Sequence, residues 1–131
     1  MPLKCIVVTP ERTVRDETAE FVALPLFDGE IGIAPGHSPM IGRLGFGEMR
    51  IKLSKDVTLR YYVEGGFVEV LDDVVSILAN RAIPAEAVKA ATAEEQLAAA
   101  RQRPANTPDL MALRDRAVSQ ARAQLRVARR G

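Results

Sequence analysis

Few residues of this chain are suited to chemistry: one His, one Cys and seventeen Asp and Glu residues. His37 precedes Ser38, but neighbours in sequence do not form a nucleophile–base pair, and no glycine elbow surrounds the serine. One His and one Cys exclude His-rich and four-Cys metal sites. The chain also lacks a Walker-type phosphate loop and a dinucleotide fingerprint. We therefore expect a protein that is not an enzyme by itself, without catalytic residues, metal or cofactor.

Length and composition indicate a soluble protein with one modest core. The chain has 131 residues, of which 47% are hydrophobic, and no apolar run approaches the ~18 residues that span a bilayer. The N-terminus carries no pattern of a secretory signal or a transit segment. Cys5 lies in an apolar, strand-like run, which predicts a buried thiol, and a single cysteine cannot form an internal disulfide. These features favour a reducing, cytosolic-side location.

Short alternating segments before Pro84 predict strands with one buried and one solvent-facing side. The predicted strands span residues 3–8, 12–16, 19–26, 31–33, 47–53, 57–63, 66–71 and 74–80. Turn signals separate them at Thr9-Pro10, Phe27-Asp28-Gly29, Lys55-Asp56, Gly65-Gly66 and Asp72-Asp73. Many short strands without a helical period between them predict a small antiparallel β-sandwich or a flattened barrel over residues 1–84, and we take the sandwich as the expected fold.

Alanine dominates after Pro84, and the hydrophobic period becomes helical. Thr92 and Glu95 fit a capping box, which predicts a helix that starts at Thr92 and runs to about Arg103. Thr107 and Pro108 then predict the start of a second helix. One stripe of this second helix contains Leu110, Leu113, Ala117, Val118, Ala121, Leu125 and Ala128. Residues 85–131 are therefore expected to form an antiparallel helical hairpin, a second domain.

Charge is distributed unevenly although the net charge is +1. Residues 1–84 carry nine basic and twelve acidic residues (−3), and residues 85–131 carry nine and five (+4). Six arginines on the last segment make up the surplus: Arg114, Arg116, Arg122, Arg126, Arg129 and Arg130. Of these, Arg122, Arg126 and Arg129 share a face that we expect to be free for a partner. A basic helix can meet nucleic acid, an anionic membrane or an acidic protein, or can simply be a solvated face.

The expected second helix has no Phe, Tyr or Trp on which a base could stack, which argues against a nucleic-acid reader. A small β-module joined to a helical hairpin offers two faces for two partners. From the residues alone, a stand-alone protein-binding module and a nucleotide-sensing regulator both remain open.

The stretch from Asp28 to Met40, DGEIGIAPGHSPM, packs three glycines and two prolines into thirteen residues. It is followed by LGFGEMRI at residues 44–51 and EGGFVEV at residues 64–70. With these motifs the chain resembles the epsilon subunit of the F-type ATP synthase. The resemblance runs from Lys4 to the C-terminus and is strongest over the first two thirds. It implies a β-sandwich at the foot of the rotating central stalk, in contact with the gamma subunit and the membrane-embedded ring of c subunits.

The resemblance also assigns roles to residues. The family's DGE-GI-PGH-P segment helps to contact the c ring, and its counterparts here are Glu30, Ile31, Gly32, His37, Pro39 and Met40. The family's hairpin can extend toward the alpha and beta subunits and restrain ATP hydrolysis through basic residues. The plausible counterparts of those residues are Arg114, Arg116, Arg122 and Arg126. Some members bind ATP between the helices, but Lys89 and Thr92 replace the acid and the arginine of that motif, so we expect no ATP binding.

The function that the resemblance implies is that of a non-catalytic rotor subunit, which couples ion-driven rotation of the c ring to ATP synthesis. We expect it at the cytoplasmic face of a bacterial cell membrane, as a peripheral part of the complex, without a membrane span and without nucleic acid as a partner.

Overall fold

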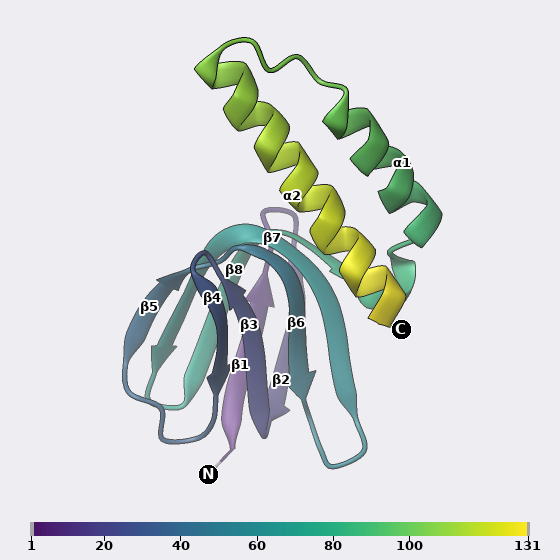
Figure 1. Cartoon of the computed structure of the whole chain (residues 1–131). Helices are drawn as coiled ribbons and strands as arrows, with labels where there is room; N and C mark the ends of the chain where they lie inside the picture. Colours follow the sequence, from purple (N-terminus) through teal and green to yellow (C-terminus); the bar gives the residue numbers. More distant parts are fainter. Residues whose placement is uncertain (1, 131) are drawn as a thin grey trace.

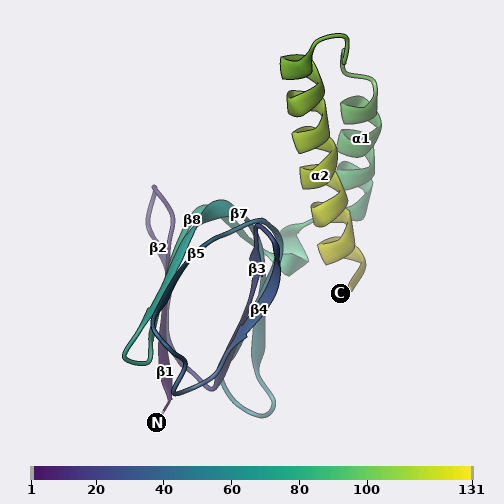
Figure 2. The same cartoon turned by 60° about the vertical axis from the view of Figure 1, so that its left-hand side comes forward.

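The computed structural model describes residues 2–130 as a β-sandwich with a two-helix hairpin standing at one corner (Figures 1 and 2). The strands are β1 (Leu3–Val8), β2 (Thr13–Ala19), β3 (Phe21–Leu26), β4 (Gly29–Ile33), β5 (Met40–Arg43), β6 (Phe46–Lys52), β7 (Thr58–Leu71) and β8 (Val74–Pro84). A 3-10 turn, η1 (Ala85–Ala87), leads to the helices α1 (Ala90–Arg101) and α2 (Pro108–Arg130). The predicted fold class, a sandwich followed by a helical hairpin, is confirmed.

The strands form one sheet that folds over on itself. Its order is β2-β1-β8-β7-β6-β3-β4, and β5 pairs with β7 outside this path. All pairs are antiparallel except β1 and β8, which run parallel. The first half of β7 pairs with β6 and its second half pairs with β5, so β7 passes from one layer into the other (Figure 2).

The predicted turn at Gly65-Gly66 is wrong, because β7 continues through both glycines. Their φ angles are +60° and +104°, in a region that residues with a side chain rarely adopt. A Cβ on Gly66 would lie 1.9 Å from the carbonyl oxygen of Leu78 on the neighbouring strand. The two glycines therefore bend a continuous strand between the layers, and sequence alone does not distinguish such a bend from a turn.

The apolar side chains that alternate along the strands fill the space between the two layers of the sandwich, as predicted. The large side chains that are fully buried include Leu24, Ile33, Met49, Ile51, Val63, Val68 and Ile77. Cys5 is also fully buried, so the predicted burial of the thiol is confirmed. One element escaped prediction: the short strand β5 begins at Met40, which the sequence placed in a loop.

The helix starts were predicted with mixed success. Thr107 does cap α2, because its Oγ1 accepts a hydrogen bond from the amide of Leu110 at 3.2 Å. Thr92 does not cap α1, which begins two residues earlier, at Ala90. Since alanine is the best helix former, Ala90 and Ala91 extend the helix past the proposed cap. No helix within residues 2–130 is long and apolar enough to cross a membrane.

The predicted apolar stripe of α2 is only partly buried. Ala121 is buried, but Leu113 is 55% exposed. Ala123, Gln124 and Val127 are buried instead. The difference arises because the last turns of α2 pack against both α1 and the sandwich, whereas its first turns, beyond the edge of the sandwich, contact α1 alone (Figure 1).

Candidate interaction sites

The loop between β4 and β5, residues 34–39 (the base loop), lies at the end of the sandwich away from the hairpin (Figure 1). Hydrogen bonds from two of its backbone amides shape it: the amide of His37 donates to the carbonyl of Ala34 at 3.2 Å, and the amide of Gly36 donates to the side-chain Oδ1 of Asp73 at 2.7 Å. The ring Nδ1 of His37 is hydrogen-bonded to the carbonyl of Ser38 at 2.7 Å. These hydrogen bonds tie the base loop to itself and to the turn between β7 and β8.

The structure brings together only part of the predicted contact set. His37 and Pro39 lie in the base loop, half-buried and exposed respectively. Met40 and Ile31 lie on the flanking strands, where their side chains pack partly against the core. Gly32 is exposed beside the ring of Phe21, whose Cζ would lie 2.6 Å from a Cβ at this position.

Glu30 is separate from the base loop. It lies near the start of β4, and its Oε1 accepts a hydrogen bond from the guanidinium of Arg50 at 2.7 Å. It lines a small cavity whose other walls include Arg126 and Arg130 of α2. Because a strand rises about 3.3 Å per residue, the length of β4 places Glu30 and His37 toward opposite ends of the sandwich.

The contact between hairpin and sandwich is a site that sequence reasoning missed. Tyr62 on β7 is fully buried, and it packs with Ala85, Ala123 and Val127. The adjacent Tyr61 points into the sandwich core. Two successive large apolar residues on a strand indicate that both faces are covered, and this signal could have revealed the contact.

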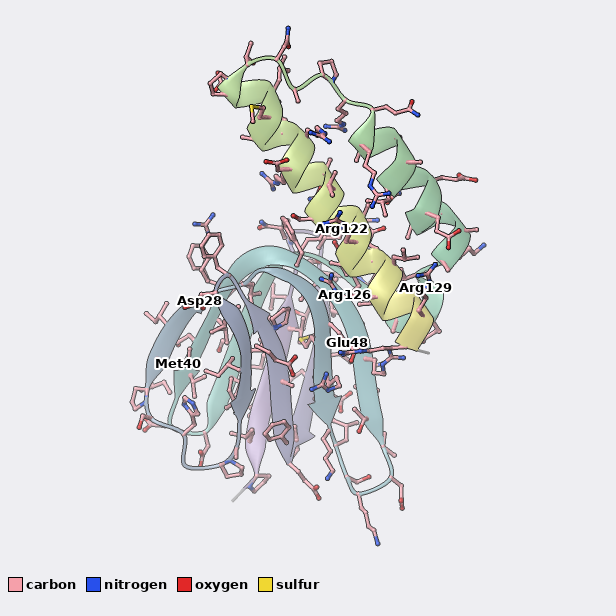
Figure 3. All side chains as sticks on the ribbon, in the orientation of Figure 1. Asp28, Met40, Glu48, Arg122, Arg126 and Arg129 are labelled. Atoms are coloured by element: carbon pink, nitrogen blue, oxygen red, sulfur yellow. The ribbon has the colours of Figure 1, made fainter. Side chains whose placement is uncertain are left out.

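Glu48 on β6 lies at one margin of this contact, with its side chain only 5% exposed. Its Oε2 accepts a hydrogen bond from Arg60 Nε at 2.9 Å, and its Oε1 lies 3.3 Å from both Arg50 Nη1 and Arg130 Nη1. Burial raises the pKa of Glu48, but the hydrogen bonds from Arg60 and Arg50 and the charges of Arg60 and Arg130 outweigh it and leave the pKa below its ordinary value. Figure 3 shows Glu48 beside the last turn of α2.

A second carboxylate, Glu64, lies at the other margin. Its Oε1 accepts a hydrogen bond from the hydroxyl of Tyr62 at 2.7 Å and a longer one from Gln124 Nε2 at 3.4 Å. Arg81 on β8 lies 3.5 Å away. The polar groups that join α2 to the sandwich are thus centred on two glutamates on neighbouring strands.

The predicted basic residues of α2 differ in their surroundings. Arg122 and Arg126 are exposed (Figure 3). Arg116, also exposed, extends over the ring of Phe46, with its Cζ 5.9 Å from the ring centroid. Arg114 is half-buried, and among the described residues its Nε has no hydrogen-bond partner. The expectation that Arg129 is free was wrong, since its Nη2 donates to Glu94 Oε1 of α1 at 2.7 Å.

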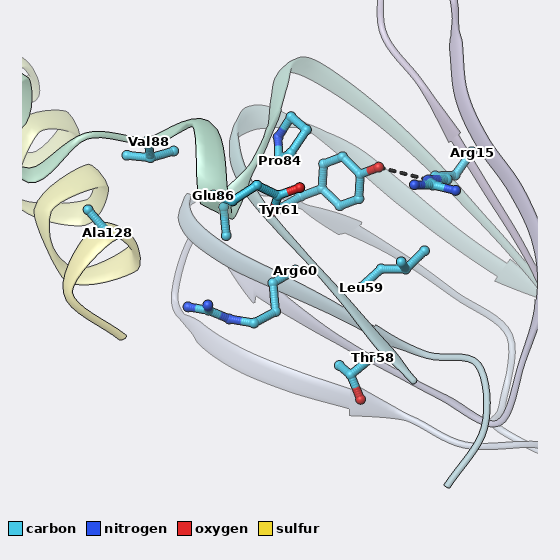
Figure 4. A pocket seen from close by; sticks show the side chains of 10 residues that line it. Arg15, Thr58, Leu59, Arg60, Tyr61, Pro84, Glu86, Val88 and Ala128 are labelled. Carbon is cyan, nitrogen blue, oxygen red and sulfur yellow. Dashed lines mark hydrogen bonds between the residues drawn. The ribbon is translucent and has the colours of Figure 1, made fainter. Parts of the chain in front are cut away.

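A cavity of about 450 Å³ lies where β7 and β8 lead into the hairpin (Figure 4). Arg15 and Tyr61 form one wall, joined by a hydrogen bond from Arg15 Nε to the phenolic oxygen at 2.7 Å. Pro84, which pairs with Tyr61 across β7 and β8, also lines the cavity, together with Glu86 and Val88. The described residues contain no cluster of three or more His, Cys, Asp and Glu side chains that could hold a metal.

The outer face of the layer that contains β5 and β8 exposes large apolar side chains. Ile41 is 75% exposed, and Phe67 and Leu78, which are paired directly across β7 and β8, are 58% and 54% exposed. The guanidinium of Arg43 lies over the ring of the exposed Phe27, with Cζ of Arg43 4.9 Å from the ring centroid. Exposed apolar side chains gathered on one face, here with Arg43 and Glu69 among them, suit a protein-binding surface.

Comparisons with known proteins agree with these features. The family described as "ATP synthase, Delta/Epsilon chain, beta-sandwich domain" matches residues 2–85. The ATP synthase epsilon chain of Rhodopirellula baltica is 49% identical over 129 residues, covering 98% of this chain and 100% of the relative. That of Pelotomaculum thermopropionicum is 43% identical over 88 residues, covering 67% of this chain and 65% of the relative.

Solved structures share the fold at low sequence identity. A chain of the Euglena gracilis mitochondrial ATP synthase, in a structure of OSCP, F1 and the c-ring, superposes with a TM-score of 0.85 at 19% identity, covering 93% of this chain and 78% of that chain. A chain of the Tetrahymena thermophila mitochondrial ATP synthase, in a structure of the central stalk and c-ring, gives 0.78 at 15% identity, covering 98% and 97%.

Proposed function

The chain belongs to the epsilon chains of ATP synthase, and we propose that it works as a rotor subunit of the central stalk. As an epsilon chain it is a non-catalytic subunit of the complex. The observation that carries the proposal is the identity of 49% to an epsilon chain over nearly the whole length, hairpin included. The rotor role is to couple ion-driven rotation of the c ring to ATP synthesis, from a peripheral position at the cytoplasmic face of a bacterial membrane.

The base loop is the proposed contact with the c ring. It is held by hydrogen bonds at Gly36 and His37, lies at the end of the sandwich far from the hairpin, and carries His37 and Pro39. The side chains of Met40 and Ile31 pack partly against the core and so anchor the flanking strands. Gly32 has no side chain, which leaves room for the ring of Phe21 beside β4. Glu30 is engaged with Arg50 and lies apart from the loop, so we expect it to contribute least.

The gamma subunit is the proposed partner of the exposed apolar face. A rotor subunit needs a second contact besides the ring, and Ile41, Phe67 and Leu78 form the most apolar part of the exposed sheet surface. Because this face and the base loop adjoin at β5, both contacts can form at once (Figure 1).

Restraint of ATP hydrolysis is the proposed task of the hairpin. Arg122 and Arg126 are exposed on α2, and the exposed Arg116 lies earlier on the same helix. An extended hairpin would present all three to acidic surfaces of the alpha and beta subunits. Arg114 is half-buried, so we assign it a supporting role in the hairpin. Each exposed charge contributes about 1 kcal/mol or less, so the restraint needs several arginines together.

Crosslinking in assembled complexes tests the ring contact. Single cysteines at His37 or Pro39 should crosslink to cysteines in the polar loops of the c subunits, and a cysteine at Asn106, at the tip of the hairpin, should not. If the cysteine at Asn106 crosslinks and neither loop position does, the c ring contacts the hairpin end of the molecule and the proposed contact is wrong. Co-purification with gamma should be lost when Phe67 and Leu78 are replaced by Ser.

Charge neutralisation tests the restraint. Replacing Arg116, Arg122 and Arg126 by Gln should raise ATP hydrolysis by the assembled complex, and higher ionic strength should partly reproduce the effect, because salt screens exposed charges over ~10 Å at 0.1 M. The matched control replaces the exposed Arg101 and Arg103 near the end of α1. Equal hydrolysis in the triple variant and the control would exclude the restraint.

A further inference from the structure

The last turns of α2 lie on a polar face built by two neighbouring strands. Three outward residues of β6 oppose three outward residues of β7 in register, as the pairs Phe46 with Glu64, Glu48 with Tyr62, and Arg50 with Arg60. Among residues 2–130, the apolar part of this contact consists of the buried Tyr62, Ala85, Ala123 and Val127, with the half-buried Phe46, Ile83 and Val88 packed against them. The members that belong to α2, Ala123 and Val127, have small side chains, so the polar groups around them contribute to how firmly the helix is attached.

Arg60 caps the end of α2. Its Nη2 donates a hydrogen bond to the carbonyl oxygen of Val127 at 3.3 Å. Val127 belongs to the last four residues of the helix, whose carbonyls have no partner within the helix. A cation at this end also interacts favourably with the helix dipole. The cap comes from the sandwich, so it is lost if the hairpin leaves.

Glu48 holds this cap in place. Its carboxylate binds Arg60 through Nε at 2.9 Å and through Nη2, which directs the remaining guanidinium hydrogens toward α2. The same carboxylate lies 3.3 Å from Arg130 Nη1 at the end of the helix. Without the negative charge of Glu48, the guanidinium groups of Arg60 and Arg130 would lose the anion that they share, and Arg50 would keep its ion pair with Glu30 alone.

We propose that Glu48 is the latch of the hairpin: its carboxylate, through Arg60 and Arg130, keeps the C-terminal end of α2 on the sandwich, and removing its charge releases the hairpin. Glu64 contributes less to the attachment, because it accepts one hydrogen bond from the helix, from the neutral amide of Gln124, whereas the group around Glu48 contacts α2 twice and through guanidinium groups. The latch concerns the isolated chain and holds independently of any contact with a c ring or gamma subunit.

Distance measurements on the full chain test the latch. Dyes attached to cysteines at Asp56, in the exposed turn between β6 and β7, and at Asn106, at the hairpin tip, report the position of the hairpin by energy transfer. Cys5 is fully buried and remains unlabelled in the folded protein. Glu48→Gln should increase the population with a changed distance by roughly tenfold, the size expected for the loss of hydrogen bonds to a charged group.

The control is Glu94→Gln, the same substitution at an exposed ion pair between α1 and α2 that does not touch the sandwich. An unchanged distance distribution in Glu48→Gln, or an equal change in Glu94→Gln, overturns the proposal. If Glu48→Gln unfolds the sandwich, Arg130→Gln decides, because Arg130 is 57% exposed at the end of α2 and its loss cannot unfold the core. A shift in the same direction supports the latch, and an unchanged distribution overturns it.

Discussion

The side chain of Asp73 accepts a hydrogen bond from the backbone amide of Gly36 at 2.7 Å, between residues that lie 37 positions apart in the sequence. Asp73 belongs to the turn between β7 and β8, where its φ angle is +62°. Its backbone oxygen also accepts a hydrogen bond from the amide of Lys4 at 2.8 Å. One residue thus joins the base loop, a hairpin turn and the first strand.

Replacing Asp73 by Ala should loosen the base loop. The variant loses the acceptor for Gly36 and places a residue without a local hydrogen bond at positive φ, which together should cost about 1–3 kcal/mol of the free energy of unfolding. Asp73→Asn keeps an acceptor oxygen and tolerates positive φ, so it serves as the matched control. Amide hydrogen exchange at Gly36 should speed up in the Ala variant alone. Equal exchange in both variants would show that another contact holds the loop.

Gly66→Ala should be among the most damaging single substitutions in the sandwich. The new Cβ would meet the carbonyl oxygen of Leu78 at 1.9 Å, so β7 and β8 must separate or the bend must change. We expect a loss of at least about 3 kcal/mol, measured by urea unfolding. Gly36→Ala is the control, since its φ is +84° but its Cβ meets nothing within 4 Å, which isolates the backbone cost of about 1 kcal/mol. Similar losses in both variants would contradict the steric argument.

Local patterns predicted most of this fold, because alternation and capping are encoded by neighbouring residues. The strands around Met49 and Ile77 and the cap at Thr107 followed directly from such patterns. The contact of the hairpin with the sandwich did not, since Glu48 and Arg130 lie 82 positions apart and nothing local pairs them. Glu30 was grouped with His37 by adjacency in a motif, although the direction of β4 separates them.

Cys5 should resist thiol reagents in the folded protein. Burial, followed by the charges of Glu17 and Asp16, raises the pKa of the thiol to about 12, so almost no reactive thiolate forms near neutral pH. Titration with a chromogenic disulfide at pH 8 should give a slow reaction whose rate equals the rate of unfolding, and a fast reaction in denaturant. An exposed cysteine introduced at Asn106 provides the fast reference in the folded state. Comparable rates at the two positions would contradict the buried thiol.

Glu48 should make the stability of the protein depend on pH in the acidic range. Its folded-state pKa lies below the ordinary value, so its carboxylate contributes stability that is present above the unfolded-state pKa and lost as the pH falls through the folded-state pKa. The groups that face it are Arg50, Arg60 and Arg130. We expect Glu48→Gln to cost about 1.5–3 kcal/mol at neutral pH and progressively less below about pH 4.

Urea unfolding of both proteins between neutral and acidic pH measures this difference. The control is Glu30→Gln, which removes an exposed partner of Arg50 and should cost about 1 kcal/mol or less at neutral pH. A difference between wild type and Glu48→Gln that stays constant with pH would show that the carboxylate is not ionised in the folded protein, or that the substitution acts through packing.

Residues 1–84 should fold without the hairpin, as a domain of their own. Truncation after Pro84 falls at the last residue of β8, so every strand keeps its ladder partners. The fragment exposes Tyr62, whose burial in the full chain comes from Ala85, Ala123 and Val127, and the free energy of unfolding should fall by about 1.5–3 kcal/mol.

Replacing Tyr62 by Thr in the fragment should improve its solubility, because an exposed aromatic on a strand favours association. The same replacement in the full chain should instead weaken the hairpin contact. Cooperative unfolding of the fragment, seen by circular dichroism, would establish two separable domains, and gradual unfolding would show that the sandwich requires α2 on its outer face.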